Sequence, residues 1–232
     1  MTLEPLLILW DIDGTLIRSG GLAAEIFELA LAAVTGEVPR ERVRMSGKTD
    51  PQIISEYLAM MGVDDPGVLP AVLELAEQEL AAAESLLFEQ GSICAGAYDL
   101  LERLSTYDTV TQTLLTGNVA PNARVKLRAF GLDHFIDFEI GAYGSDHAER
   151  TSLVPIALER AKRLRSLRID RDRTWVIGDT PNDAACARAG GVHCLLVASG
   201  TYSLEELQLH PADATLADLH DTDLVMGLIG AP

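Results

Sequence analysis

The sequence predicts an α/β fold, a doubly wound parallel sheet with a block of helices inserted after the first strand. Three observations predict it. Residues 6–10 form a short apolar run, as expected for a strand that is covered on both faces. Residues 17–90 then show only helical patterns. From residue 91 onward, helical segments alternate with short apolar runs, which is typical of βαβ units.

The inserted block contains three expected helices. The first is rich in Ala and Leu and carries an apolar stripe. The second begins at Pro51, because Thr49 and Asp50 provide a capped start and proline is favoured at the first helical position. The third is a long Ala/Leu/Glu segment with room for one break. These helices are expected over residues 21–34, 51–61 and 69–88.

The rest of the chain supplies the other strands and the helices that cover them. Strands are expected over residues 109–115, 135–140, 174–177 and 192–197. Helices are expected over residues 97–105, 121–130, 152–164 and 181–189, with a short one near residue 204 and a last one over 217–228. A chain of 232 residues is long enough for a core and a smaller inserted domain. We therefore predict an α/β core domain, residues 1–16 and 91–232, and a helical cap domain, residues 17–90.

Charge and cysteine content narrow the classes of partner. The chain has 35 acidic and 18 basic residues, and its formal charge of −17 repels phosphate backbones and anionic lipid surfaces. The cysteines, Cys94, Cys186 and Cys194, lack Cys-x-x-Cys spacing and fit a reducing compartment. Neither a signal peptide nor an apolar stretch of about 20 residues is recognisable. We expect a cytoplasmic protein that binds no nucleic acid and no membrane.

The segment 11–15, with the sequence DIDGT, directly follows the first apolar run. In an extended backbone the side chains of Asp11 and Asp13 project to the same side. Two carboxylates this close repel each other unless a hard cation or a shared proton compensates. The pair therefore indicates a Mg²⁺ site with a nucleophile and a general acid/base. The alternative is an ordinary strand that ends in an Asp-Gly turn at Gly14.

A second polar junction, Thr116-Gly117-Asn118, comes between the predicted strand 109–115 and the next helix. A hydroxyl group together with free backbone amides at such a junction commonly holds phosphate oxygens. The alternative is that Thr116 or Asn118 simply caps the helix.

The end of the predicted strand 174–177 places Asp179 at its tip and Asp183 four residues later. If Thr180 caps the following helix and Pro181 opens it, both carboxylates can reach the same cation. A lone buried Asp179 would cost several kcal/mol, which favours a metal ligand. For Asp183, the alternative is a favourable interaction with the helix dipole.

Arg150 precedes a predicted helix on the same side of the sheet. A cation there would stabilise a nucleophilic carboxylate and the charge that develops on a transferring phosphoryl group. A solvated surface arginine is the alternative.

Taken in order, these four motifs resemble those of haloacid dehalogenase (HAD) superfamily hydrolases of the phosphoglycolate phosphatase type. The resemblance implies that Asp11 is the nucleophile that forms an aspartyl-phosphate and that Asp13 is the general acid/base. It implies a Rossmann-like core with a helical cap, and a small phosphorylated metabolite as substrate for a monomer or homodimer. The implied Mg²⁺ ligands are Asp11, the backbone carbonyl of Asp13, Asp179 and Asp183.

The same resemblance assigns phosphate binding to Thr116 and the Gly117 amide, and Gly14, Thr15 and Asn118 are further candidate substrate contacts. The family's third motif is usually Lys followed by Pro, whereas this sequence has Arg150 followed by Thr151. Lys126 is therefore a competing candidate for that role.

Residues 46–50 are similar to the loop that caps of this type insert into the active site, and Lys48 is a candidate substrate contact. A plain turn with Asp50 as helix cap is equally compatible with this segment. The function expected from the resemblance is a phosphatase. A phosphomutase of the β-phosphoglucomutase type would use the same catalytic groups, and Asp13 argues against a dehalogenase, because halide needs no proton. A binding protein that retains the fold is a further alternative, which the intact acids disfavour.

Overall fold

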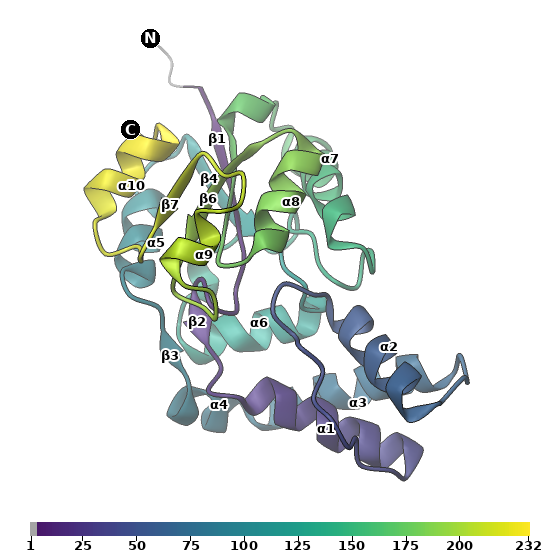
Figure 1. Cartoon of the computed structure of the whole chain (residues 1–232). Coiled ribbons are helices and arrows are strands. Elements are labelled where there is room, and N and C mark those ends of the chain that lie inside the picture. The colour runs from purple at the N-terminus through teal and green to yellow at the C-terminus, as the bar shows by residue number, and fades with distance from the viewer. Residues whose placement is uncertain (1–3) are drawn as a thin grey trace.

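The computed structural model describes residues 4–232 and contains a five-stranded parallel sheet in the order β4-β1-β5-β6-β7 (Figure 1). Strand β1 lies in the centre and pairs with β4 on one side and β5 on the other. This arrangement confirms the doubly wound α/β fold. The strands are β1 (Leu6–Trp10), β4 (Val110–Leu114), β5 (Thr174–Gly178), β6 (His193–Val197) and β7 (Ala214–Leu216).

Both faces of the sheet are covered by helices. Alternate side chains of β1 enter separate apolar clusters, Leu6, Ile8 and Trp10 on one face and Leu7 and Leu9 on the other, because successive side chains of a strand point to opposite faces. One cluster includes side chains of α5 (Ala97–Ser105), α6 (Ala120–Ala129) and α10 (Thr222–Ile229). The other includes α7 (Leu153–Arg165), α8 (Pro181–Gly190) and α9 (Leu204–Leu207).

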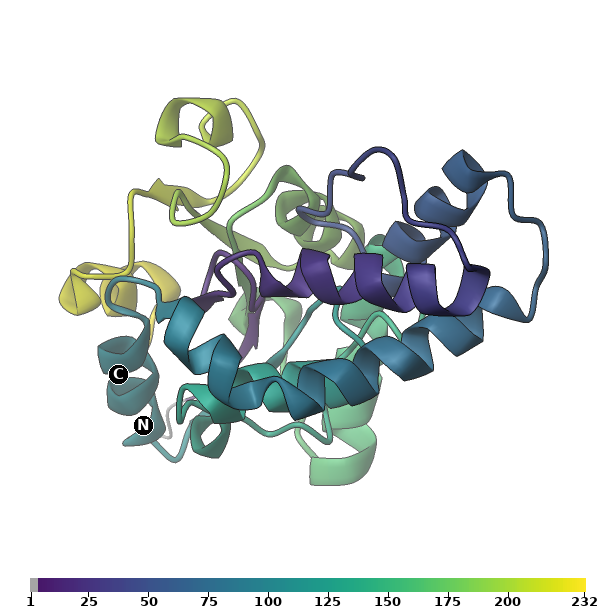
Figure 2. The same cartoon turned by 90° about the horizontal axis from the view of Figure 1, so that it is seen from below.

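Four helices lie between β1 and α5 in the sequence, namely α1 (Leu22–Thr35), α2 (Asp50–Met61), α3 (Val68–Ala82) and α4 (Glu84–Gln90). The expected break in the long helix occurs at Ala83. Figure 2 shows α1 lying alongside α3, and α3 and α4 pack against α6 of the core. Two short antiparallel strands, β2 (Ile17–Arg18) and β3 (Ser92–Ile93), connect the helices to the core.

The expected strand 135–140 is wrong. Residues Asp133–Phe135 form a 3-10 helix, and beyond it only an isolated bridge joins Leu115 to Ala142. The alternation of apolar and acidic residues in this segment resembles a strand. However, the segment keeps backbone hydrogen bonds to β4 only at its two ends, from the Asp137 amide to the Gln112 carbonyl and from the Ala142 amide to the Leu114 carbonyl, both at 2.9 Å. Between these ends it forms a turn, in which the Asp137 carboxylate accepts a hydrogen bond from the Glu139 amide at 3.1 Å.

The C-terminal part also differs from the expectation. Strand β7, which the sequence analysis did not predict, is a three-residue edge strand. The last helix begins at Thr222 rather than at 217, because the Asp221 side chain caps it by accepting a hydrogen bond from the Leu224 amide at 3.0 Å. Short 3-10 turns at Arg150–Ser152 and Arg171–Arg173 complete the described elements. The other expected helices and strands are confirmed to within two residues at their ends.

Within residues 4–232, none of the helices has both the length and the apolar character that crossing a bilayer requires.

Candidate active site

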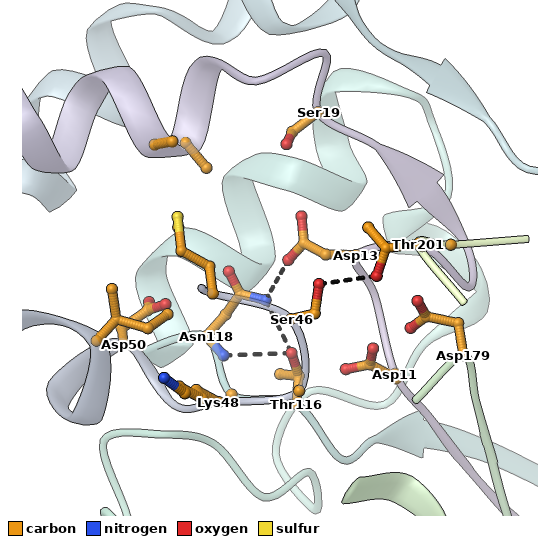
Figure 3. A pocket seen from close by; sticks show the side chains of 18 of the residues that line it. Asp11, Asp13, Ser19, Ser46, Lys48, Asp50, Thr116, Asn118, Asp179 and Thr201 are labelled. Carbon is orange, nitrogen blue, oxygen red and sulfur yellow. Dashed lines mark hydrogen bonds between the residues drawn. The ribbon is translucent and has the colours of Figure 1, made fainter. Parts of the chain in front are cut away.

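A cavity of about 420 Å³ lies where the carboxyl ends of β1, β4 and β5 meet the inserted helices (Figure 3). Ligands of open α/β sheets gather at this edge, because the loops that follow the parallel strands converge there. The predicted site residues that line the cavity are Asp11, Asp13, Gly14, Lys48, Thr116, Gly117, Asn118, Arg150 and Asp179. Thr15 and Asp183 do not line the cavity, and the side chains of both are fully buried.

Asp11 and Arg150 form a buried ion pair at the floor of the cavity. Asp11 directly follows β1, and its carboxylate accepts a hydrogen bond of 2.7 Å from Nη2 of Arg150. The same Nη2 contacts Asp183. Burial raises the pKa of Asp11 to about 7, against the lowering effect of the Arg150 charge. Arg150, rather than the competing candidate Lys126, therefore contacts the first aspartate of the DIDGT segment.

Asp179 and Asp183 follow β5 and face the same volume as Asp11. Burial and the nearby charge of Asp11 raise the pKa of Asp179 to about 9. Thr180 is the N-cap of α8, and Asp183 accepts hydrogen bonds from its amide at 3.0 Å and from its hydroxyl at 2.7 Å. The helix start that the sequence predicted thus turns Asp183 back toward the strand tip. Thr15 approaches Asp179 with its hydroxyl at 3.5 Å.

The three acids Asp11, Asp179 and Asp183 fit a hard divalent cation. One carboxylate oxygen from each lies within 4.8 Å of the others, and all three side chains are buried. Oxygen donors of this kind suit Mg²⁺. Glycines leave the room that Asp179 occupies, since a Cβ at Gly14 would lie 2.4 Å from its Oδ2 and a Cβ at Gly200 only 1.6 Å. A cation would also offset the repulsion among carboxylates that burial has brought together.

Asp13 belongs to a separate network beside these acids (Figure 3). Its Oδ2 accepts hydrogen bonds from Lys126 Nζ at 2.6 Å and from Asn118 Nδ2 at 2.8 Å. Asn118 also binds Lys126 through its carbonyl oxygen and the Thr116 hydroxyl through its amide group. Lys126 is almost fully buried, whereas the Asp13 side chain is 39% exposed toward the cavity side. The network holds Asp13 through Oδ2, and Oδ1 forms no hydrogen bond with the described residues.

The loop before α2 closes over the core. The Asp50 amide donates to the Gly117 carbonyl at 2.8 Å, and the Thr49 hydroxyl donates to the Ala148 carbonyl at 2.8 Å. Gly117 permits this approach, since a Cβ there would lie 2.0 Å from the Lys48 carbonyl oxygen. Lys48 lines the cavity but forms an ion pair with Glu56.

Thr49, and not Asp50, provides the side chain that caps α2, by accepting a hydrogen bond from the Gln52 amide. The Asp50 carboxylate instead accepts a bond of 2.9 Å from the Val119 amide at the start of α6. Burial raises the pKa of Asp50 to about 6, although the charge of Lys126 opposes this. The alternative in which Asp50 caps its own helix is therefore wrong.

Several cavity residues were missed by the sequence analysis. Asp50 links the inserted helices to the core through its hydrogen bond with the Val119 amide. This contact depends on how α2 is placed against α6, which the sequence does not indicate. Arg18, whose Nε donates to the Ser199 carbonyl at 2.9 Å, and Gly200 also line the cavity. The small polar residues that follow β6 could have indicated Gly200 as a cavity residue, because polar or small residues after a strand had already identified the ends of β1, β4 and β5 as parts of the site.

The family model of haloacid dehalogenase-like hydrolases matches residues 6–191. This chain belongs to that family. Among curated relatives, it is similar to the tyrosine-protein kinase PtkA of Mycobacterium tuberculosis, with 28% identity over 201 residues. That alignment covers 85% of this chain and 63% of PtkA, so the chain spans less than two thirds of the length of the curated relatives it matches.

Solved structures show the same fold for this HAD-like hydrolase. CbbY from Rhodobacter sphaeroides in complex with phosphate aligns with a TM-score of 0.74 and 21% identity, over 94% of this chain and 96% of CbbY. A hydrolase from Pseudomonas syringae aligns with a TM-score of 0.71 and 21% identity, over 98% of this chain and all of that chain. At this level of identity, the likeness establishes the fold alone.

The buried carboxylates of this HAD-like hydrolase predict a stability that depends on pH and on metal. The pKa values of Asp11 and Asp179, about 7 and about 9, lie above the ordinary value of 3.8, so the folded protein retains protons that the unfolded chain releases. Stability must therefore fall as pH rises from about 4 to about 9. We expect the melting temperature of the chelated protein to fall over this interval, and added Mg²⁺ to raise it most at the alkaline end.

Differential scanning calorimetry with EDTA or with Mg²⁺ measures this effect. Asp179→Asn removes the group with the larger shift, so it should flatten the pH dependence of the chelated protein and weaken the response to Mg²⁺. Asp64→Asn, at an exposed position between α2 and α3, is the matched control and should change neither. A melting temperature of the chelated protein that stays constant across the interval would contradict the expectation.

Proposed function

We propose that this HAD-like hydrolase is a Mg²⁺-dependent phosphatase that hydrolyses a small-molecule phosphate monoester through an aspartyl-phosphate on Asp11. The observation that supports this most directly is the position of the Asp11 carboxylate. It lies at the floor of the cavity, bound to Arg150 and within reach of the same cation as Asp179 and Asp183, while Asp13 lines the same cavity. A carboxylate in this setting can act as a nucleophile toward phosphorus.

In the first step, an Asp11 oxygen attacks phosphorus and the bond between phosphorus and the ester oxygen breaks. The leaving oxygen takes a proton from Asp13, whose second oxygen Oδ2 is held by Lys126 and Asn118. The product alcohol departs, and phosphate remains bonded to Asp11. Proton donation matters because an alkoxide is a poor leaving group without it.

In the second step, water attacks the phosphorus of the aspartyl-phosphate. Asp13, now ionised, accepts the proton of this water, the bond between phosphorus and Asp11 breaks, and inorganic phosphate is released. The acid of the first step thus becomes the base of the second, and both groups return to their starting protonation.

The phosphoryl oxygens would be held by groups at the floor of the cavity. Nε of Arg150 is buried and has no protein acceptor within the described part of the chain. A buried donor without an acceptor is costly, and a phosphate oxygen would satisfy it. The Thr116 hydroxyl and the Gly117 backbone border the same space. We propose that Gly14, Thr15 and Asn118 shape this pocket around them.

Mg²⁺ would be held by the carboxylates of Asp11, Asp179 and Asp183, together with the Asp13 backbone carbonyl. Its charge would offset the repulsion between the Asp11 carboxylate and the phosphate dianion. Lys48 is the cap residue that we propose as a contact to the leaving group.

The proposed function is tested by following phosphate release from p-nitrophenyl phosphate in Mg²⁺ and in EDTA. We expect EDTA to lower the rate by at least about 100-fold and Mg²⁺ to restore it. A rate that chelation leaves unchanged would refute the metal requirement. Beryllium fluoride should mimic the phosphoryl group on Asp11 and inhibit. A protein that neither releases phosphate nor binds the fluoride complex would instead be a binding protein. Adding a hexose phosphate and measuring isomer formation against phosphate release separates a phosphatase from a phosphomutase.

We also propose that the protein works in the reducing cytoplasm. Cys94, Cys186 and Cys194 are all free and buried. Burial raises the pKa of the Cys94 thiol to about 11 and that of Cys186 to about 12, which keeps both groups in the protonated form.

A further inference from the structure

The wall of the cavity that faces the acids is apolar. Most of its side chains come from α1, from the loop before α2 and from α2 itself. They are Ala23, Ala24, Phe27, Met45 and Ile53. Figure 3 shows Ser19, in the loop between β2 and α1, on the side opposite Asp11 and Asp179. An ester group placed between this wall and the phosphate site would contact methyl, thioether and aromatic groups.

Two of the polar side chains on the helical side are already engaged. Ser46 shares a hydrogen bond of 3.0 Å with Thr201, and Lys48 forms an ion pair with Glu56. The Ser19 side chain forms no hydrogen bond with the described residues, so one hydroxyl group of a sugar placed there could bind it. The other hydroxyl groups would be buried against apolar side chains, which is unfavourable. An apolar group would instead gain from leaving water.

The charges that line the cavity balance one another. The acidic residues are Asp11, Asp13, Asp50 and Asp179, and the basic residues are Arg18, Lys48, Lys126 and Arg150. Lys126 and Arg150 are bound to Asp13 and Asp11, at 2.6 Å and 2.7 Å. Arg18 is exposed and bound to the Ser199 carbonyl, so solvent screens its charge. Arg150 is also bound to Asp183, and Lys48 is bound to Glu56, so each of the less exposed cations already has a carboxylate partner and none is left unpaired for a second anionic group.

We infer that the substrate is a phosphate monoester whose leaving group is uncharged and largely apolar, and that a second phosphate or a carboxylate is selected against. This inference rests on the proposed phosphatase function and specifies its substrate. The net charge of −17 adds a general repulsion toward any second anion. The inference depends on the ion pair between Glu56 and Lys48, because this pair neutralises the Lys48 charge that would otherwise attract a second phosphate or a carboxylate.

The test compares benzyl phosphate with 4-carboxybenzyl phosphate, because the two esters break the same bond and differ only in a remote charge. We expect kcat/KM to be higher for benzyl phosphate by at least about tenfold. Glu56→Gln frees Lys48, so it should narrow this ratio at least about threefold by raising kcat/KM for the carboxylated ester. The Glu56 side chain is 38% exposed, so the substitution keeps the fold. Glu89→Gln, at an exposed position on α4, removes the same charge and should leave the ratio unchanged.

The outcomes separate the two proposals. Equal rates for the two esters, or a preference for the carboxylated one, would overturn the inference about the leaving group and leave the phosphatase function standing. A ratio that Glu56→Gln and Glu89→Gln change equally would overturn the role of the ion pair. Hydrolysis of neither ester, together with none of p-nitrophenyl phosphate, would refute the phosphatase function, and the inference would fail with it.

Discussion

Replacing Asp11 by asparagine is expected to abolish turnover, with a loss of about 10³-fold or more in kcat. The amide lacks the negative charge and the lone-pair reactivity needed to attack phosphorus, so no aspartyl-phosphate can form. The fold should remain, because the substitution preserves the shape of the side chain. It also relieves the repulsion of Asp11 with Asp179 and Asp183, whose carboxylate oxygens lie within 4.8 Å.

Phosphate release and acid-stable labelling of the protein by a radioactive ester both report this loss. The matched control is Asp64→Asn, which neutralises an exposed carboxylate outside the cavity and should retain full activity. Circular dichroism and the melting temperature verify that the Asp11 variant is folded. A folded Asp11→Asn variant with more than a tenth of the original activity would exclude Asp11 as the nucleophile.

Asp13→Asn is expected to slow hydrolysis by about 10²–10⁴-fold for esters with poor leaving groups. The reason is that asparagine cannot protonate the departing oxygen. A p-nitrophenolate group departs without a proton, so the first step should be affected far less for p-nitrophenyl phosphate than for an alkyl ester such as benzyl phosphate. Burst kinetics with the aryl ester isolate that step from the later attack by water, which also uses Asp13.

The control for this variant is Asn118→Ser, which keeps Asp13 and removes one of the groups that orient it, at 2.8 Å. It should lower the rates by smaller factors than Asp13→Asn does, and more for the alkyl ester than for the aryl ester. If Asp13→Asn instead impairs the burst with the aryl ester as severely as turnover of the alkyl ester, Asp13 is not the general acid.

Residue patterns were sufficient for the sheet and most helices. The buried runs of β1, β5 and β6 could be recognised because strands covered on both faces are almost entirely apolar. The prediction of a strand over residues 135–140 was wrong, because the alternating pattern of a half-buried strand also occurs in a segment with a local turn, here one in which Asp137 accepts a hydrogen bond from the Glu139 amide. Strand β7 contains only three residues, and its pairing with β6 depends on tertiary contacts.

The site residues that directly follow strands could be predicted from the sequence. The contacts between segments on opposite sides of the cavity could not. Asp11 and Asp179 come directly after β1 and β5, and adjacent parallel strands bring such residues together. No local pattern indicates that Lys126 binds Asp13 or that Glu56 binds Lys48, because these pairs depend on how α6 and α2 are placed. The predicted domain boundaries at residues 16 and 90 stay a prediction.

The close approach of Gly117 to the loop before α2 has a consequence for substrate access. Hydrogen bonds from Asp50 to Gly117, from Thr49 to Ala148 and from Asn182 to Gly47 hold the two sides together. Exchanging each for water costs about 0.5–1.5 kcal/mol, or about 1.5–4.5 kcal/mol together. A conformer in which all three bonds are exchanged for water would then have a population of about 0.05–7%. For a ligand that enters only through that conformer, we expect the apparent dissociation constant to exceed the intrinsic one in proportion.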